Sequence, residues 1–272
     1  MVPKVPNAFE TPDVSEGGVS SGLRTLIVIP AYNEEASLPE VLRELATTVP
    51  ECDVLVVDDG SRDATSAVAH AGGVRVVTLP FNIGVGGALR AGFKYAVMHD
   101  FDRVVQVDGD GQHEPDDLKV LIAALDRGAS LVIGSRFADP SSTYKVGGLR
   151  WGAMRLLRLV VRVMSGRRFT DTTSGFRAFD RAIVERFSRE LSSEYMADTV
   201  EALLRALAEG YVVVEVPVRM RPRSGGQASQ SPLMLLYQYS RLLVVIVSSA
   251  SRRIGSNKQP LPIPSRASEG GR

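Results

Sequence analysis

Two aspartates one residue apart, Asp108 and Asp110, follow a short apolar run at 103–107. If this run is a buried strand, both carboxylates reach one small volume, where each raises the pKa of the other. A hard divalent cation relieves this repulsion, because Mg²⁺ and Mn²⁺ take carboxylate oxygens and bridge to substrate phosphates. Asp-Gly-Asp alone is common in loops, so the prediction of a metal site depends on its surroundings.

Two further acidic clusters also follow apolar runs. Tyr32 and Glu34 come after the first run of the chain, and Asp58 and Asp59 come after the second. Capping of a turn or helix explains one of the paired aspartates and leaves the other unexplained. The Tyr32 ring is either a half-buried loop aromatic or a platform for a nucleobase. Three acidic strand ends in one chain indicate a ligand site.

The hydrophobic pattern predicts strands that alternate with helices. Strands are expected at 26–29, 53–57, 74–79, 103–107 and 130–135, and helices at 33–48, 64–71, 84–99 and 118–125. Continuous apolar strands are covered on both faces, which is typical of an α/β fold with a Rossmann-like, mostly parallel sheet and helices on both faces. Ligands of such sheets bind at the carboxyl ends of the strands, where the acidic clusters lie.

The second half of the chain carries two segments suited to a membrane surface. Residues 149–163 mix apolar positions with Arg155, Arg158 and Arg162, which share one helical face. That face is either solvated or lies on anionic lipid. Residues 230–254 are strongly apolar but lack the roughly 20 clean residues of a spanning helix. We expect an interfacial helix there, with a small membrane-protein partner or burial against the chain's own core as alternatives.

Composition narrows the remaining possibilities. The 272 residues include 32 Lys and Arg against 31 Asp and Glu, so no basic excess points to nucleic acid. The single cysteine, Cys52, excludes an internal disulfide and fits a reducing compartment. Polar, Pro- and Gly-rich ends predict a disordered leader at 1–22 and a disordered tail at 255–272, with the globular domain at 23–229.

Taken in order, several motifs resemble glycosyltransferase family 2. They are Ile29-Pro30-Ala31-Tyr32-Asn33-Glu34-Glu35, Val57-Asp58-Asp59-Gly60-Ser61 and Asp108-Gly109-Asp110-Gly111-Gln112-His113. Within that family the chain is similar to polyprenyl-phosphate sugar synthases of the dolichol-phosphate mannosyltransferase type, through Gly134-Ser135-Arg136, the segment 171–177 and the segment 216–226. The resemblance implies a GT-A fold with membrane-associated C-terminal helices. It also implies transfer of a sugar, with inversion, from a UDP- or GDP-linked donor to a polyprenyl phosphate at the cytoplasmic face of the membrane.

The resemblance also implies roles for individual residues. A first group would hold the base and ribose of the donor: Pro30, Tyr32, Glu34, Val57 and Asp59. Asp108 and Asp110 would bind Mg²⁺ or Mn²⁺, with Gln112 beside them. Arg136 would face the acceptor phosphate or the donor sugar, and Arg223 the donor phosphates. Asp110, Arg136 and Asp171 are the expected catalytic residues.

The acceptor and the donor remain open at this point. A phosphate monoester is already anionic near neutral pH and needs no strong general base. A hydroxyl acceptor would need a carboxylate such as Asp171 or Asp198, for which helix capping or an arginine ion pair is an equal alternative. The mannosyltransferases carry a lysine where this chain has Ser229, so a UDP-linked glucose or N-acetylhexosamine is as well supported as GDP-mannose.

Two other classes of function fit less well. A nucleotidyltransferase would carry a Gly-rich, basic loop after the first strand, where this chain has Pro-Ala-Tyr-Asn-Glu-Glu. A non-catalytic nucleotide-sugar-binding subunit would have no need for the full acidic set.

Overall fold

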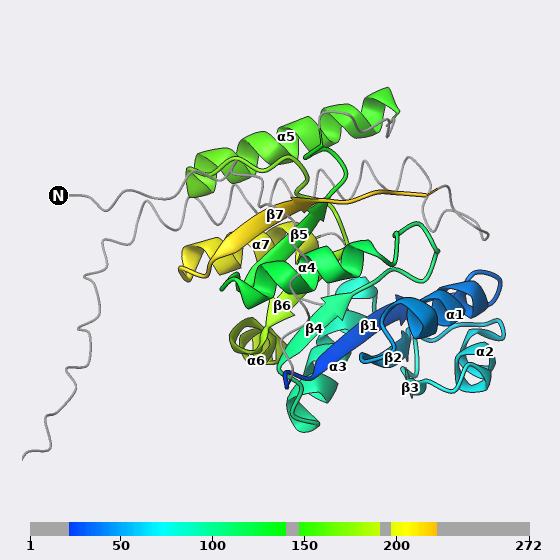
Figure 1. The fold of residues 1–272 in the computed structure, drawn as a ribbon. Helices are drawn as coiled ribbons and strands as arrows, with labels where there is room; N and C mark the ends of the chain where they lie inside the picture. The colour runs from blue at the N-terminus through cyan, green and yellow to red at the C-terminus, as the bar shows by residue number, and fades with distance from the viewer. Residues whose placement is uncertain (1–21, 140–146, 191–196, 222–272) are drawn as a thin grey trace, which may run out of the picture. The chain divides into compact units, whose positions relative to one another are not determined.

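A computed structural model describes residues 22–139, 147–190 and 197–221, which form one seven-stranded sheet with helices on both faces (Figure 1). The strand order is β3-β2-β1-β4-β6-β5-β7, and all neighbours are parallel except for β6, which is antiparallel to β4 and β5. The strands are β1 (Thr25–Ala31), β2 (Asp53–Asp58), β3 (Arg75–Thr78), β4 (Arg103–Gln106), β5 (Leu131–Ser135), β6 (Arg177–Asp180) and β7 (Val213–Pro217). The predicted α/β class and mostly parallel sheet are confirmed.

Seven helices are assigned in these ranges. They are α1 (Leu38–Thr48), α2 (Thr65–Ala71), α3 (Val85–Met98), α4 (Asp117–Asp126), α5 (Gly148–Ser165), α6 (Arg181–Glu190) and α7 (Ala197–Ala208). Helices α3 and α6 pack together on one face of the sheet, and α4 covers β4 to β7 on the other (Figure 1). Helix α5 packs against α7.

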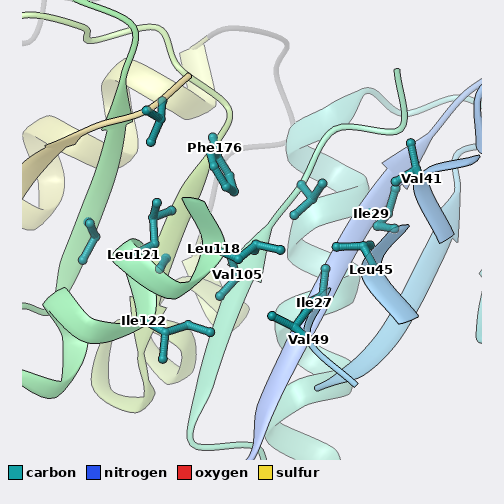
Figure 2. Close-up of a cluster of buried hydrophobic side chains, with 14 of the residues drawn as sticks. Ile27, Ile29, Val41, Leu45, Val49, Val105, Leu118, Leu121, Ile122 and Phe176 are labelled. Carbon is teal, nitrogen blue, oxygen red and sulfur yellow. The ribbon is translucent and has the colours of Figure 1, made fainter. Parts of the chain in front are cut away.

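Alternation along β1 explains how both faces are covered. Ile27 and Ile29 enter a core with α1 and α4 (Figure 2), whereas Val28 points to α3. At Gly92 of α3, a Cβ would lie only 2.5 Å from Cγ1 of Val28. The small residues of α3 therefore allow this helix to pack closely on the sheet.

Helix α1 begins later than its periodicity predicts. Asn33 has a φ of 56°, a left-handed conformation that cannot continue a right-handed helix. The carbonyl of Glu34 accepts the N–H groups of Ser37 and Leu38, so a turn at 34–37 precedes the helix. The residues directly after β1 therefore form a loop that precedes the helix.

The pair β6 and α6 was not predicted. Strand β6 has four residues and includes Arg177, so it lacks a strand-like apolar run. Its arginine is nevertheless 1% exposed and donates to the carbonyls of Ser174, Thr199 and Thr172. These backbone carbonyls compensate for the cost of burying the Arg177 guanidinium. Composition alone does not reveal such contacts.

Helix α5 confirms the helix predicted at 149–163. Within the three described ranges, no helix is long and apolar enough to cross a membrane. The predictions of a leader at 1–22, an interfacial helix at 230–254 and a tail at 255–272 concern residues that lie, apart from Gly22, outside the described ranges.

Candidate active site

The two aspartates of the predicted metal site follow β4 at the carboxyl end of the sheet. Asp108 is partly exposed, and Asp110 is buried at 8% exposure. Oδ1 of Asp110 accepts the backbone N–H of Gln112 at 3.1 Å, which tightens the loop. Burial raises the pKa of Asp108, and the Asp110 carboxylate adds to this rise. A cation bound beside Asp108 would oppose this rise in pKa, because a positive charge favours the ionised carboxylate.

This donor set fits a divalent cation of the Mg²⁺ type. Asp108 and Asp110 supply hard oxygen donors from a single loop, and Gln112 lies two residues further on. In the part of the chain that the structure describes, no group of three or more His, Cys, Asp and Glu side chains forms a metal cage. Mg²⁺ characteristically takes one or two carboxylates and completes its shell with water and substrate phosphates.

His113 is a buried residue that contacts Asp108. Its ring is 6% exposed and stacks on Phe176, with ring centroids 4.5 Å apart and planes inclined by 13°. Its Nδ1 accepts the backbone N–H of Asp108 at 3.3 Å, and its Nε2 lies 3.6 Å from Oδ2 of the same residue. A histidine near an acidic pair is easily read as a metal ligand, but these contacts make His113 a support for Asp108.

Arg136 and Asp171, 35 positions apart, form a buried bidentate ion pair. Nε of Arg136 donates to Oδ2 of Asp171 at 2.6 Å, and Nη2 donates to Oδ1 at 2.8 Å. Asp171 has no exposed surface, and Arg136 is 6% exposed. Burial alone would raise the pKa of Asp171, but the Arg136 guanidinium outweighs it and holds this pKa below its usual value. An ionised, paired carboxylate of this kind is a poor general base.

Glu215 of β7 holds the loop that carries Asp171, a role that sequence analysis missed. Its carboxylate accepts the backbone N–H of Thr170 at 2.8 Å and that of Asp171 at 2.8 Å. Burial raises the pKa of Glu215, although these two N–H groups oppose the rise. The only signal in the sequence is an acidic residue inside an apolar strand, Val213–Pro217.

The two halves of the site meet at Gly175. A Cβ at this position would lie 2.8 Å from Oδ1 and 2.9 Å from Oδ2 of Asp108. The guanidinium of Arg136 is also close enough to Asp108 to favour its charged form. The structure therefore brings together four residues that the sequence predicts for catalysis or metal binding, namely Asp108, Asp110, Arg136 and Asp171.

We expect Gly175→Ala to displace the Asp108 carboxylate, since the new methyl group would collide with both of its oxygens. The sugar-transfer activity that the sequence resemblance implies should fall at least ~10-fold, because small misplacements of a catalytic group are costly. Mn²⁺ titration of activity checks this, with Gly147→Ala as control because a Cβ there meets nothing within 4 Å. Equal Mn²⁺ dependence of the two variants would contradict the steric explanation.

The predicted nucleotide-binding residues at the end of β1 and directly after it lie at the same edge of the sheet. Tyr32 is 36% exposed, so its ring is accessible to a base, and Pro30 is partly exposed. Glu34 lies beside the loop 108–113 that carries the two aspartates, here called the metal loop. A Cβ at Gly109 would be 3.6 Å from Cγ of Glu34. Its Oε2 accepts the Ser37 hydroxyl at 2.7 Å, which orients the carboxylate.

The residues at the end of β2, and Asp59 directly after it, have structural contacts. Asp59 is 3% exposed, and its two oxygens accept the N–H groups of Ile83 and Gly84, both at 2.8 Å. Oδ1 of Asp58 accepts the N–H of Ser61 at 2.9 Å, and the side chain of Val57 is fully buried. Val57 and Asp59 are therefore buried side chains, and the nucleotide contacts expected of them stay a prediction.

Arg223 and Ser229 lie outside the described residues. For Asp198, the structure describes the helical backbone and leaves its side chain undescribed. Their roles stay predictions.

Most of the described chain matches a known protein family. The model of Glycosyl transferase family 2 matches residues 26–187, which include every strand from β1 to β6 and both halves of the site. The chain belongs to this family. The matched range contains Asp108, Asp110, Arg136 and Asp171.

Two curated members of the family are similar over most of their length. The polyprenol monophosphomannose synthase of Mycolicibacterium smegmatis is 33% identical over 215 residues, covering 76% of this chain and 81% of the relative. The undecaprenyl-phosphate mannosyltransferase of Micrococcus luteus is 34% identical over 220 residues, covering 77% and 88%.

A solved structure is similar in fold. Glucosyl-3-phosphoglycerate synthase of Mycobacterium tuberculosis, crystallised with Mn²⁺, uridine diphosphate and phosphoglyceric acid, gives a TM-score of 0.66 at 22% identity, covering 89% of this chain and 84% of that chain. The predicted GT-A fold is confirmed by this likeness.

Proposed function

We propose that this family 2 member is an inverting glycosyltransferase that moves a sugar from a UDP- or GDP-linked donor to a polyprenyl phosphate. The product would be a lipid-phospho-sugar that donates to glycan assembly in the cell envelope. The observation that carries the proposal is the meeting of Asp108 and Asp110 with the Arg136–Asp171 pair at one sheet edge. The relatives named as polyprenol and undecaprenyl-phosphate mannosyltransferases support the acceptor class.

The chemistry requires stabilisation of the departing nucleoside diphosphate. Asp108 and Asp110 would hold Mg²⁺ or Mn²⁺, which when bound neutralises charge on the leaving diphosphate. Arg136, kept in one orientation by Asp171 and by Thr173 at 2.9 Å, provides a fixed positive charge beside this position. Tyr32 and Glu34 would bind the nucleoside, and Arg223 the phosphates.

The state of Asp171 favours an anionic acceptor. Its lowered pKa and its bidentate pairing leave it poorly suited to accept a proton from a hydroxyl. A phosphate monoester needs no such base, because its oxygen is already a nucleophile near neutral pH. The in-line attack of a phosphate oxygen on the anomeric carbon would displace the nucleoside diphosphate and invert the configuration.

Helix α5 would hold the protein on the membrane. It exposes Trp151 (48%), Leu156 (44%), Leu159 (53%) and Val163 (76%). Arginines 155 and 162 are exposed on the same helix, so apolar and cationic side chains share its outer surface. Such a surface suits anionic lipid, and we propose peripheral attachment to the cytoplasmic face, aided by the apolar segment 230–254 as a membrane-associated helix.

Helix α5 is also linked to the site. Nη1 of Arg158 lies 3.5 Å from the carbonyl of Thr170, whose hydroxyl lies 2.6 Å from that of Ser135. Ser135 and Thr170 directly precede Arg136 and Asp171. A lipid phosphate presented at the membrane surface would therefore approach the ion pair from the side of α5.

Replacing Leu159 and Val163 together by glutamate should weaken binding to phosphatidylglycerol vesicles at least ~10-fold, because two apolar anchors are lost and negative charge is added. Co-sedimentation of the full chain measures this. Met98→Glu is the matched control, since Met98 is 77% exposed on α3. Equal loss in both proteins, or none in either, would argue against α5 as the membrane surface.

The function is tested by offering radiolabelled GDP-mannose, UDP-glucose, UDP-galactose and both UDP-N-acetylhexosamines with polyprenyl phosphate in detergent. We expect labelled lipid from one donor, dependent on Mn²⁺ or Mg²⁺ and lost with EDTA. Nucleotide binding without any labelled lipid would overturn the acceptor assignment and indicate a hydroxyl acceptor on a polysaccharide or glycolipid. Absence of nucleotide-sugar binding altogether would overturn the enzyme assignment.

A further inference from the structure

Directly after β7 the chain turns back across the loop that carries the metal-binding aspartates. Backbone N–H of Arg221 donates to the carbonyl of Gln112 at 2.9 Å, and its Nη2 donates to the carbonyl of His113 at 3.0 Å. Met220 pairs with His113 in an isolated antiparallel bridge. One arginine therefore binds two successive carbonyls of the metal loop, through its backbone and its side chain.

The same Arg221 guanidinium also binds helix α1. Nη1 donates to Oε1 of Glu44 at 2.8 Å, and Nη2 donates to Oε2 at 2.6 Å, although the two residues are 177 positions apart. Their side chains are only 33% and 21% exposed. A half-buried, bidentate pair of this kind is geometrically specific and holds its partners in one arrangement.

Further contacts link the Arg221–Glu44 pair to Asp108 and Asp110. Gln112 and His113, whose carbonyls Arg221 holds, contact the two aspartates directly. The N–H of Gln112 bonds to Asp110, and the His113 ring accepts the N–H of Asp108. Outer partners of this type orient metal ligands, and their loss commonly lowers metal affinity ~10–100-fold.

We propose that Arg221, anchored by Glu44, is a positioning residue for the metal site: it sets the loop 112–113 and, through it, Asp108 and Asp110. This inference rests on the proposed function, since it takes these aspartates as metal ligands. Arg221 also stands two residues before Arg223, the predicted phosphate-binding residue.

The test is Mn²⁺ binding by the full chain in the presence of UDP or GDP. Electron paramagnetic resonance of the free Mn²⁺ measures this binding. Arg221→Ala should raise the Mn²⁺ concentration for half-saturation at least ~10-fold. Arg219→Ala is the matched control: it removes a neighbouring arginine whose side chain contacts Asp117 on α4 at 3.0 Å. That variant should change Mn²⁺ binding less than about twofold, because the Arg219 side chain is 69% exposed and pairs with α4.

Two further variants separate positioning from general destabilisation. Arg221→Lys keeps the charge but not the two-pronged geometry, so its Mn²⁺ half-saturation should lie between wild type and Arg221→Ala. Glu44→Gln should weaken Mn²⁺ binding on its own and add nothing when combined with Arg221→Ala, since both act through one contact. Thermal unfolding of each variant identifies any that fail to fold.

A folded Arg221→Ala protein with wild-type Mn²⁺ binding would overturn the inference and leave the proposed function intact. Additive effects of the Glu44 and Arg221 changes would overturn the anchoring role of Glu44. A wild-type protein that binds no Mn²⁺ with either nucleotide would overturn the metal-dependent function and this inference together.

Discussion

Replacing Asp110 by asparagine should abolish sugar transfer while leaving the fold intact. The change removes one of two negative charges from the loop after β4 but keeps the oxygen that accepts the N–H of Gln112. Charge neutralisation of a leaving diphosphate by a metal is worth several kcal/mol, so turnover should fall by ~10³-fold or more. Transfer assays across a range of Mn²⁺ concentrations would measure the loss.

The control is Asp116→Asn on the same stretch of chain. The Asp116 side chain is 64% exposed and pairs loosely with Lys119 at 3.6 Å. Its removal should change activity and stability little, because exposed pairs of this kind contribute under about 1 kcal/mol. If Asp110→Asn retained wild-type turnover in excess EDTA, the metal-dependent mechanism would be wrong.

Replacing Asp171 by asparagine should cost both stability and activity. The guanidinium of Arg136 would then be buried without its carboxylate, and removing one partner of a buried pair typically costs about 3–5 kcal/mol. Turnover should also fall by ~10²-fold, because the orientation of Arg136 would be lost. Urea unfolding and initial-rate kinetics measure the two effects.

The destabilisation should depend on pH in a defined direction. The folded-state pKa of Asp171 is lowered, so its contribution is fully present above the unfolded pKa of about 3.9 and is lost as pH falls through the folded value. The difference in unfolding free energy between wild type and Asp171→Asn should therefore be constant near neutral pH and shrink below about pH 4.

Glu185→Gln provides the comparison for an exposed pair. Glu185 is 45% exposed and accepts from Arg181 one helical turn away, so its loss should cost less than about 1 kcal/mol. A stable, normally folded Asp171→Asn protein that loses all turnover with a hydroxyl acceptor would contradict the positioning role. It would assign Asp171 as a general base.

The sequence alone determined the class of the fold and the edge of the sheet that carries the chemistry. Apolar runs such as 26–29 and 103–107 report burial on both faces locally, so they predict parallel strands without knowledge of strand order. The polar residues that follow them, Asp108 among them, must then lie at the carboxyl edge. Motif order was sufficient for the family as well.

The tertiary structure decided which side chains act on one another. Strand β6 enters the sheet antiparallel between β4 and β5, and this places Gly175 against Asp108. The same topology brings Glu215 to the loop of Asp171. No local pattern records these pairings, because hydrophobic periodicity reports only how each element is buried.

Arg221 shows most clearly that local sequence patterns do not record tertiary pairings. Its partner Glu44 stands on the first helix, and its own backbone holds the metal loop from beyond the last strand. An arginine in a polar stretch and a glutamate on an amphipathic helix are both ordinary surface residues by composition. They become a specific pair only because the chain after β7 turns back to the loop after β4 and to α1.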